Sequence, residues 1–140
     1  MKTIGLTAAL LLSATHMAYA ETQRLAIHVD ENDPKVMNLA LNNAQNVKSY
    51  YEAQGDDVIV ELVAYGPGLN MYLASSPVAS RIETMGMDES FTFSACNNTH
   101  TKMSKKAGKE LALLNDARKV PSGVVRLMEL QKEGYAYLRP

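Results

Sequence analysis

Cys96 is the only cysteine of the 140-residue chain, and its surroundings are those of a reactive thiol. It directly follows an apolar run, Phe91–Ala95, and a helix is expected to begin just after it, near Asn97 or Asn98. The first N–H groups of a helix have no partner inside the helix, and next to a sulfur atom they favour thiolate over thiol. The sequence therefore predicts a nucleophilic cysteine that carries a group. The alternative role is a small buried hydrophobe at the end of a strand.

Other polar residues follow predicted strands in the same way. In open parallel sheets, ligands bind beyond the carboxyl ends of the strands, so we expect these residues to share a pocket with Cys96. The expected ligand-pocket residues are Asn97, Asn98, Thr99, Tyr65, Gly66, His28 and Ser122. For His28, which lies inside an apolar run, a structural hydrogen bond to a backbone carbonyl is the alternative.

The segment 65–68 and His100 are two further candidates for binding sites. The segment 65–68 (Tyr-Gly-Pro-Gly) lacks both the G-x-G-x-x-G spacing of dinucleotide folds and the lysine of a P-loop, so it predicts a turn or a rigid wall beside Cys96. His100 lies four residues after Cys96, and such a pair could hold a soft metal such as copper. Two ligands do not make a site, so we predict no metal site and no cofactor.

Short apolar runs alternate with amphipathic segments along the chain. Strands are predicted at Leu25–Val29, Val58–Ala64, Phe91–Ala95 and Tyr135–Leu138, with a shorter one near Arg118–Val120. Alternating strands and helices indicate crossover connections in a parallel sheet. We therefore predict an α/β fold: a flavodoxin-like three-layer sandwich, also flavodoxin-like in strand order, with a mostly parallel sheet of about five strands.

Three helices can be placed between these strands from their capping residues. Asp33-Pro34 and Ser76-Pro77 each combine an N-cap with a proline suited to the first helical position, and Ser122 begins a third helix. The helical spacing predicts these inward-facing residues: Met37, Leu41, Ala44, Val47 and Tyr51 in the first helix, Ile82 and Met85 in the second, and Val124, Leu127 and Met128 in the third.

The N-terminal residues are typical of an export signal. Lys2 precedes an apolar run, Ile4–Leu12, and Ala18-Tyr19-Ala20 forms a small-x-small cleavage site. We expect residues 1–20 to be removed and residues 21–140 to form a single domain in the bacterial periplasm, with no membrane association after cleavage.

The composition narrows the classes of partner. The net charge of −1 leaves no basic surface of the kind that binds phosphates, so nucleic acid is not an expected partner. Hydrophobic residues make up 46% of the chain and charged residues 21%, which predicts a packed core rather than disorder. One cysteine also excludes a disulfide framework within the chain.

Residues 24–140 resemble the DsrE/DsrF-like family of small α/β proteins, in particular an exported branch of that family. The segments that carry the resemblance are 28–33 (HVDEND), 63–69 (VAYGPGL), 93–99 (FSACNNT), 120–125 (VPSGVV), 129–131 (ELQ) and 134–137 (GYAY). The resemblance implies a flavodoxin-like sandwich that associates into homo-oligomers, trimers or hexamers, and a role in sulfur metabolism. Characterised members with a cysteine after the third strand pass sulfur as a persulfide between proteins, and Cys96 matches that position.

From the resemblance and the thiol chemistry we expect a periplasmic sulfur carrier or sulfurtransferase-like protein that accepts sulfur as a persulfide on Cys96. Its partners would be a sulfur donor and a sulfur acceptor protein. A solitary cysteine suits this task because it has no internal partner with which to close a disulfide. The alternatives are a non-catalytic oligomeric module that binds a small ligand or a metal, with Cys96 and His100 as contacts, and an oligomeric scaffold whose cysteine is inert.

Overall fold

The computed structural model describes residues 20–140, so the predicted export signal lies almost entirely outside the described residues. The strands are β1 (Thr22–Val29), β2 (Asp57–Ala64), β3 (Phe91–Cys96), β4 (Ala117–Val120) and β5 (Ala136–Leu138). The helices are α1 (Pro34–Glu52), the 3-10 helix η1 (Gly66–Tyr72), α2 (Ala79–Gly86), α3 (Asn97–Ala107) and α4 (Gly123–Lys132). All five predicted strands are present, each within a few residues of its predicted bounds.

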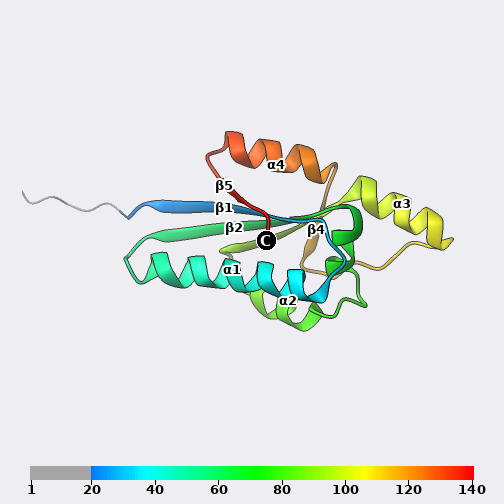
Figure 1. The fold of residues 1–140 in the computed structure, drawn as a ribbon, viewed down its shortest axis with the longest axis horizontal. Helices are drawn as coiled ribbons and strands as arrows, with labels where there is room; N and C mark the ends of the chain where they lie inside the picture. The colour runs from blue at the N-terminus through cyan, green and yellow to red at the C-terminus, as the bar shows by residue number, and fades with distance from the viewer. Residues whose placement is uncertain (1–19) are drawn as a thin grey trace, which may run out of the picture.

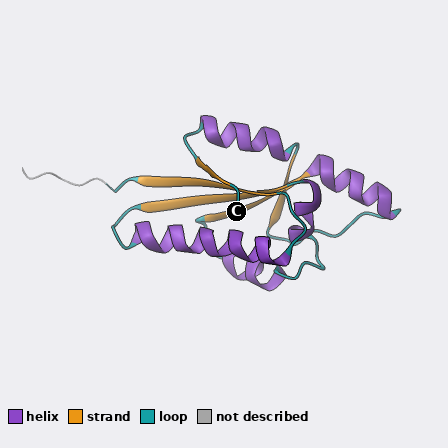
Figure 2. Ribbon diagram, in the orientation of Figure 1, coloured by secondary structure: helices purple, strands orange, loops and turns teal. Residues whose placement is uncertain are grey.

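The five strands form one sheet in the order β4-β3-β2-β1-β5, and every neighbouring pair is parallel. Helices lie on both faces of this sheet (Figures 1 and 2), which confirms the predicted α/β three-layer sandwich. The strand order differs from the 2-1-3-4-5 order of flavodoxin that was expected. Here β1 to β4 are added side by side in one direction, and only the last crossover returns to the other side of β1.

This order explains the unequal cover of the two faces. Because crossovers between parallel strands are right-handed, connections that run in one direction place their helices on one face, and a connection that runs back uses the other. Figure 1 shows α1 and α2 on one side of the sheet and α4 alone on the other, with α3 projecting beyond the end of the strands. The face beneath α4 is called the α4 face below.

The hydrophobic core is also unequal on the two faces of the sheet. The large hydrophobic cluster joins α1, α2 and η1 to the strands, with residues such as Ile27, Leu62 and Phe93 fully buried or nearly so. The cluster beneath α4 is small and consists of Ala26, Val63, Leu127 and Leu130, with Tyr65 and Tyr135 packed against it. The α4 face therefore has room for polar side chains.

Helix α1 begins as the sequence predicts. The Asp33 side chain accepts a hydrogen bond from the Lys35 N–H at 2.8 Å, and Pro34 occupies the first turn. Helix α2 begins two residues later than its proline indicated, because Ser76-Pro77 forms a turn in which the Val78 N–H donates to the Ser76 hydroxyl.

Helix α4 follows Ser122 as predicted, but part of its expected inward face was wrong. Leu127 and Leu130 are buried, whereas Val124 is 53% exposed and Met128 is 54% exposed. Gly123, Leu127 and Leu130 share the face that meets the sheet, and Val124 and Met128 lie about 100° away from it around the helix. Met37 and Met85 are buried, as expected of core methionines. None of the helices in residues 20–140 is long and apolar enough to cross a membrane.

Gly68 is required where η1 approaches β1. A Cβ atom at this position would lie 2.2 Å from the carbonyl oxygen of Val29, closer than any real contact, and the obstacle is backbone that cannot rotate away. The glycine thus allows the loop after β2 to lie against the end of β1, at the edge of the sheet where Cys96 is located.

Gly68→Ala is expected to lower the free energy of unfolding by about 1–3 kcal/mol, the usual cost of overpacking a well-packed site. Chemical denaturation would measure it, with Asn70→Ala in the same 3-10 helix as the control, since that change removes one exposed hydrogen bond to the Pro67 carbonyl. Equal stability of the two variants would contradict the close approach.

Candidate functional site

The expected site residues lie together at the carboxyl ends of the strands. Cys96 ends β3, and its register partner on β4 is Val120. Ala64 pairs with Ala95, so Tyr65, the first residue after β2, lies level with Cys96. Since side chains alternate along a strand, His28, Tyr65 and Cys96 share the α4 face with Ala26 and Val63. The order of the strands thus places these three residues side by side along one edge.

Cys96 is buried, with 4% of its surface exposed, and it is the N-cap residue of α3. Burial raises the pKa of its thiol, whereas the Thr99 hydroxyl and the N–H groups of Thr99, Gly123 and Asn98 lower it, and the net result is a pKa below the ordinary value of 9.0. The sulfur makes no capping hydrogen bond of ordinary geometry to α3, so the effect of the α3 amides is that of nearby dipoles. The site can thus stabilise a thiolate that is shielded from water.

Thr99 connects the sulfur to the loop after β2. Its hydroxyl oxygen accepts a hydrogen bond from the Gly66 N–H at 3.0 Å, which leaves the hydroxyl hydrogen free to face Cys96. Gly66 has a φ of +55°, a left-handed conformation that favours glycine, and this turn directs its N–H toward Thr99.

The loop before α4 reaches the sulfur from the other side. The Gly123 N–H lowers the thiol pKa, and Tyr65 packs so closely on this residue that a Cβ at Gly123 would lie 2.8 Å from the Tyr65 ring. Ser122 therefore acts on the cysteine only by placing its neighbour, and its own side chain does not cap α4. Asn97 and Asn98 lie in the first turn of α3, where Asn98 contributes its N–H.

His28 lies behind Tyr65 as seen from Cys96. Its ring stacks on Tyr65 with 4.5 Å between centroids, and its Nδ1 lies 2.7 Å from the Tyr137 hydroxyl. Its buried Nε2 has no hydrogen-bond partner among residues 20–140, and the Asp30 carboxylate lies 3.9 Å from it. Burial lowers the pKa of His28, Asp30 opposes that change, and Arg139 adds to it. The hydrogen-bond partner of His28 is thus a tyrosine hydroxyl and not the backbone carbonyl of the alternative role.

One ring nitrogen of His100, the residue that could pair with Cys96, is engaged elsewhere in this structure. The Nε2 atom of His100 lies 2.7 Å from the Leu111 carbonyl oxygen, so the ring is engaged in holding the segment after α3. Among the residues that the structure describes, no group of three or more histidine, cysteine or acidic side chains is arranged to hold a metal ion.

A buried ionic cluster on the α4 face was missed by the sequence analysis. Glu61 is 3% exposed, and its carboxylate accepts hydrogen bonds from the Arg126 Nε and Nη2 atoms at 2.8 Å each and from the Ser94 hydroxyl at 2.6 Å. Arg118 adds an ion pair at 2.9 Å from its Nη2. Burial raises the pKa of Glu61, but the bonds from Arg126, Ser94 and Arg118 lower it below its ordinary value. The signal in the sequence was one glutamate inside an apolar strand.

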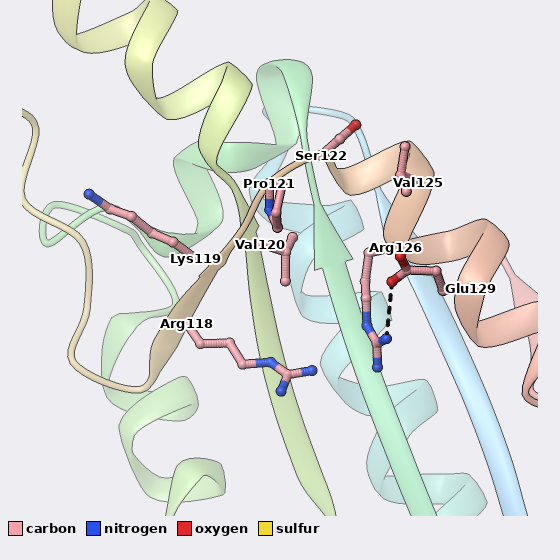
Figure 3. A pocket seen from close by; sticks show the side chains of 8 residues that line it. All are labelled: Arg118, Lys119, Val120, Pro121, Ser122, Val125, Arg126 and Glu129. Atoms are coloured by element: carbon pink, nitrogen blue, oxygen red, sulfur yellow. Dashed lines mark hydrogen bonds and ion pairs between the residues drawn. The ribbon is translucent and has the colours of Figure 1, made fainter.

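A cavity of about 340 Å³ opens between β4 and α4, beside this cluster. Figure 3 shows Arg118 and Arg126 extending toward each other across the sheet, while Lys119 points away from them. Val120 and Ser122 also line the cavity, and both belong to the segment that leads from the strand beside Cys96 to Gly123.

The comparison with solved structures gives a relative that shares most of the chain. The Methanobacterium thermoautotrophicum protein MTH1491, described as a protein of unknown function, is 30% identical in sequence, with a TM-score of 0.70. The alignment covers 84% of the present chain and 99% of MTH1491. The two proteins belong to one family. No protein-family model and no curated protein matches the sequence. The shared family with MTH1491 thus supports the fold and leaves the activity to be inferred from the site.

Thr99→Val is expected to raise the pKa of Cys96, because valine keeps the shape of threonine but removes the hydroxyl that faces the sulfur. Thr99→Ser should keep the wild-type value. The measurement is a pH titration of thiolate absorbance in the ultraviolet, with the spectrum of Cys96→Ser subtracted to remove tyrosine ionisation. A wild-type midpoint at or above 9.0 would contradict the proposed surroundings of the thiol.

Glu61→Gln is expected to cost about 3 kcal/mol of stability at neutral pH, because it leaves two arginines without their buried partner. The folded-state pKa of Glu61 lies below 4.5, so the stabilisation is complete above pH 4.5 and is lost as the pH falls through the folded pKa. Denaturation at several pH values should show the two proteins converging in acid. Glu110→Gln, at an exposed pair with Lys119, is the control and should cost at most about 1 kcal/mol.

Proposed function

We propose that this protein is a sulfur carrier or sulfurtransferase-like protein that holds sulfur as a persulfide on Cys96. The observation that carries the proposal is a solitary cysteine at the carboxyl edge of a parallel sheet, surrounded by N–H groups from two helices and by the Thr99 hydroxyl. Attack on sulfur requires a thiolate, and these dipoles favour the thiolate despite burial.

The transfer step needs no oxidant. The Cys96 thiolate attacks the outer sulfur of a hydropersulfide donor R–S–SH, and a new bond forms between Sγ and that sulfur. The S–S bond of the donor breaks, and its electron pair leaves on R–S⁻. The products are Cys96–S–SH and R–S⁻, and a thiol of the acceptor later removes the outer sulfur by the same chemistry.

The burial of Cys96 is consistent with a carrier that protects its cargo. An exposed thiolate in an oxidising compartment is converted to sulfenic acid or to mixed disulfides, and a sulfur that is 4% exposed is shielded from both. Reaction with a donor then requires local opening at this edge of the sheet, where the covering segments are the loop after β2 and the loop before α4.

We propose further that the protein acts in the periplasm as a homo-oligomer. The predicted export signal supports the location. The outward face of α4 supports the association, since Val124, Val125 and Met128 are each about half exposed, and apolar patches of this kind are common at protein interfaces. The resemblance to DsrE/DsrF-like proteins supports trimers or hexamers. Sulfur donor and acceptor proteins would be the other partners.

Intact-mass measurement tests the carrier function directly. The purified protein is treated with polysulfide, and we expect the mass of one added sulfur on the wild type, removable by a reducing thiol, and none on Cys96→Ser. Thr99→Ser serves as a control for changes near the site that keep the hydroxyl. A wild-type protein that gains no sulfur, and whose thiol also resists alkylation, would contradict the proposal and leave the inert scaffold.

A further inference from the structure

The cavity between β4 and α4 adjoins the cysteine site and has no assigned occupant. Its wall includes Val120, the register partner of Cys96, and Ser122, whose neighbour Gly123 directs its N–H to the sulfur. Its volume of about 340 Å³ is at the small end of ligand pockets, which run from about 300 to 1,000 Å³. The cavity therefore suits a small molecule bound beside Val120, the residue of β4 that neighbours Cys96.

Of the two arginines at the cavity, Arg118 keeps one guanidinium nitrogen without a partner in the part of the chain that the structure describes. The Glu61 carboxylate accepts two hydrogen bonds from Arg126 and pairs with one nitrogen of Arg118. The remaining Arg126 nitrogen, Nη1, lies 3.3 Å from the Glu129 carboxylate on α4. Arg118 also bonds Ser94 through Nε, but its Nη1 has no partner among the described residues. The Arg118 side chain is 53% exposed, so this nitrogen can be reached from the cavity.

The first turn of α4 adds hydrogen-bond donors at the same end of the cavity. It contains no acidic residue, and the Ser122 side chain does not cap the helix, so the hydroxyl and the first-turn N–H groups other than that of Gly123 remain available. Lys119 contributes less, because its Nζ pairs with Glu110 at 3.3 Å and the side chain points away from the two arginines (Figure 3).

We propose that this cavity binds the anionic end of a small sulfur donor, with Arg118 as the main contact. The inference rests on the proposed function and deepens it, because it names the class of donor: a low-molecular-weight hydropersulfide that carries a carboxylate group, or thiosulfate, whose sulfonate end is itself the anion. The free Nη1 of Arg118 can donate charge-assisted hydrogen bonds to an oxygen of either group, while Nε and Nη2 keep their bonds to Ser94 and Glu61.

The same contact assists the transfer step. With a hydropersulfide donor the leaving group is R–S⁻, and with thiosulfate it is sulfite, whose sulfur receives the electron pair of the broken S–S bond. With thiosulfate the negative charge builds up on the sulfite that the cavity holds, and a cation placed there stabilises it. With a hydropersulfide the charge builds up on the R–S sulfur, and the contact to the carboxylate positions the donor. The sulfur that is transferred moves to Sγ, and the anion stays in the cavity until it dissociates.

Equilibrium dialysis with labelled thiosulfate tests binding apart from chemistry, in a Cys96→Ser background that cannot accept sulfur. Arg118→Gln should weaken binding by about tenfold or more, as expected for loss of a charge-assisted hydrogen bond. Lys119→Gln removes the same charge from the next residue of β4, whose side chain points away, and should change binding by less than about twofold. Equal effects of the two substitutions, or no binding at all, would overturn the inference.

Arg118→Lys covers the possibility that the glutamine variant is unstable, because it keeps a positive charge opposite Glu61. It should fold as the wild type does and still bind thiosulfate more weakly, since one ammonium opposite Glu61 cannot also present a separate N–H to the cavity as Nη1 does. Unchanged binding in a stable Arg118→Lys variant would count against the Nη1 contact and overturn the assignment of Arg118.

Rates of persulfide formation in protein with Cys96 intact identify the donor. Cysteine hydropersulfide and cysteamine hydropersulfide differ by one carboxylate, so Arg118→Gln should slow the first and spare the second. A loss of rate that is confined to thiosulfate as the donor would assign the cavity to thiosulfate instead. If polysulfide modifies Cys96 while neither donor depends on Arg118, the cavity assignment is wrong and the carrier function stands.

Discussion

Holding a negative charge on a sulfur atom that water scarcely reaches is the physical constraint on which the site depends. Burial alone works against the thiolate, so the protein must supply dipoles in place of water. They come from the first turn of α3, which includes the Thr99 hydroxyl, and from the start of α4, and β4 separates these two segments along the chain. A parallel sheet brings them together because all of its strands end at the same edge, where each following helix begins.

The two faces of the sheet have different roles because the last crossover runs opposite to the first three. One face carries the large core that stabilises the fold. The other is covered by α4 alone, and its polar cluster around Glu61 is adjacent to the cavity beside Cys96. Replacing such a cluster by apolar residues is often neutral for stability, so stability alone does not explain the cluster. The proposed binding of a ligand by the free Nη1 of Arg118 does.

The layers and most element bounds could be predicted from local sequence, because strands such as Val58–Ala64 are apolar and helices such as α1 begin with a clear cap. The strand order could not, since it depends on the direction of the last crossover, which no local pattern records. The outward position of Met128 was missed for a related reason: helical spacing marks an apolar face without saying whether the sheet or another surface covers it.

The candidate site, like the fold, has parts that local sequence predicts and parts that only the three-dimensional structure shows. Its location followed from Cys96 and the strand ends, whereas the Glu61 cluster required knowing that Arg118 and Arg126, on different elements, converge on one carboxylate. The role of Thr99 also depends on geometry, because its hydroxyl is oriented by the Gly66 N–H from a loop 33 residues earlier.

The most direct test of the account is the rate of persulfide formation on Cys96 measured across pH in a single turnover. The account predicts a rate that rises with the thiolate fraction, with a midpoint below 9.0 that coincides with the spectroscopic titration of the same thiol. A rate that is independent of pH, or equal in wild type and Cys96→Ser, would contradict it.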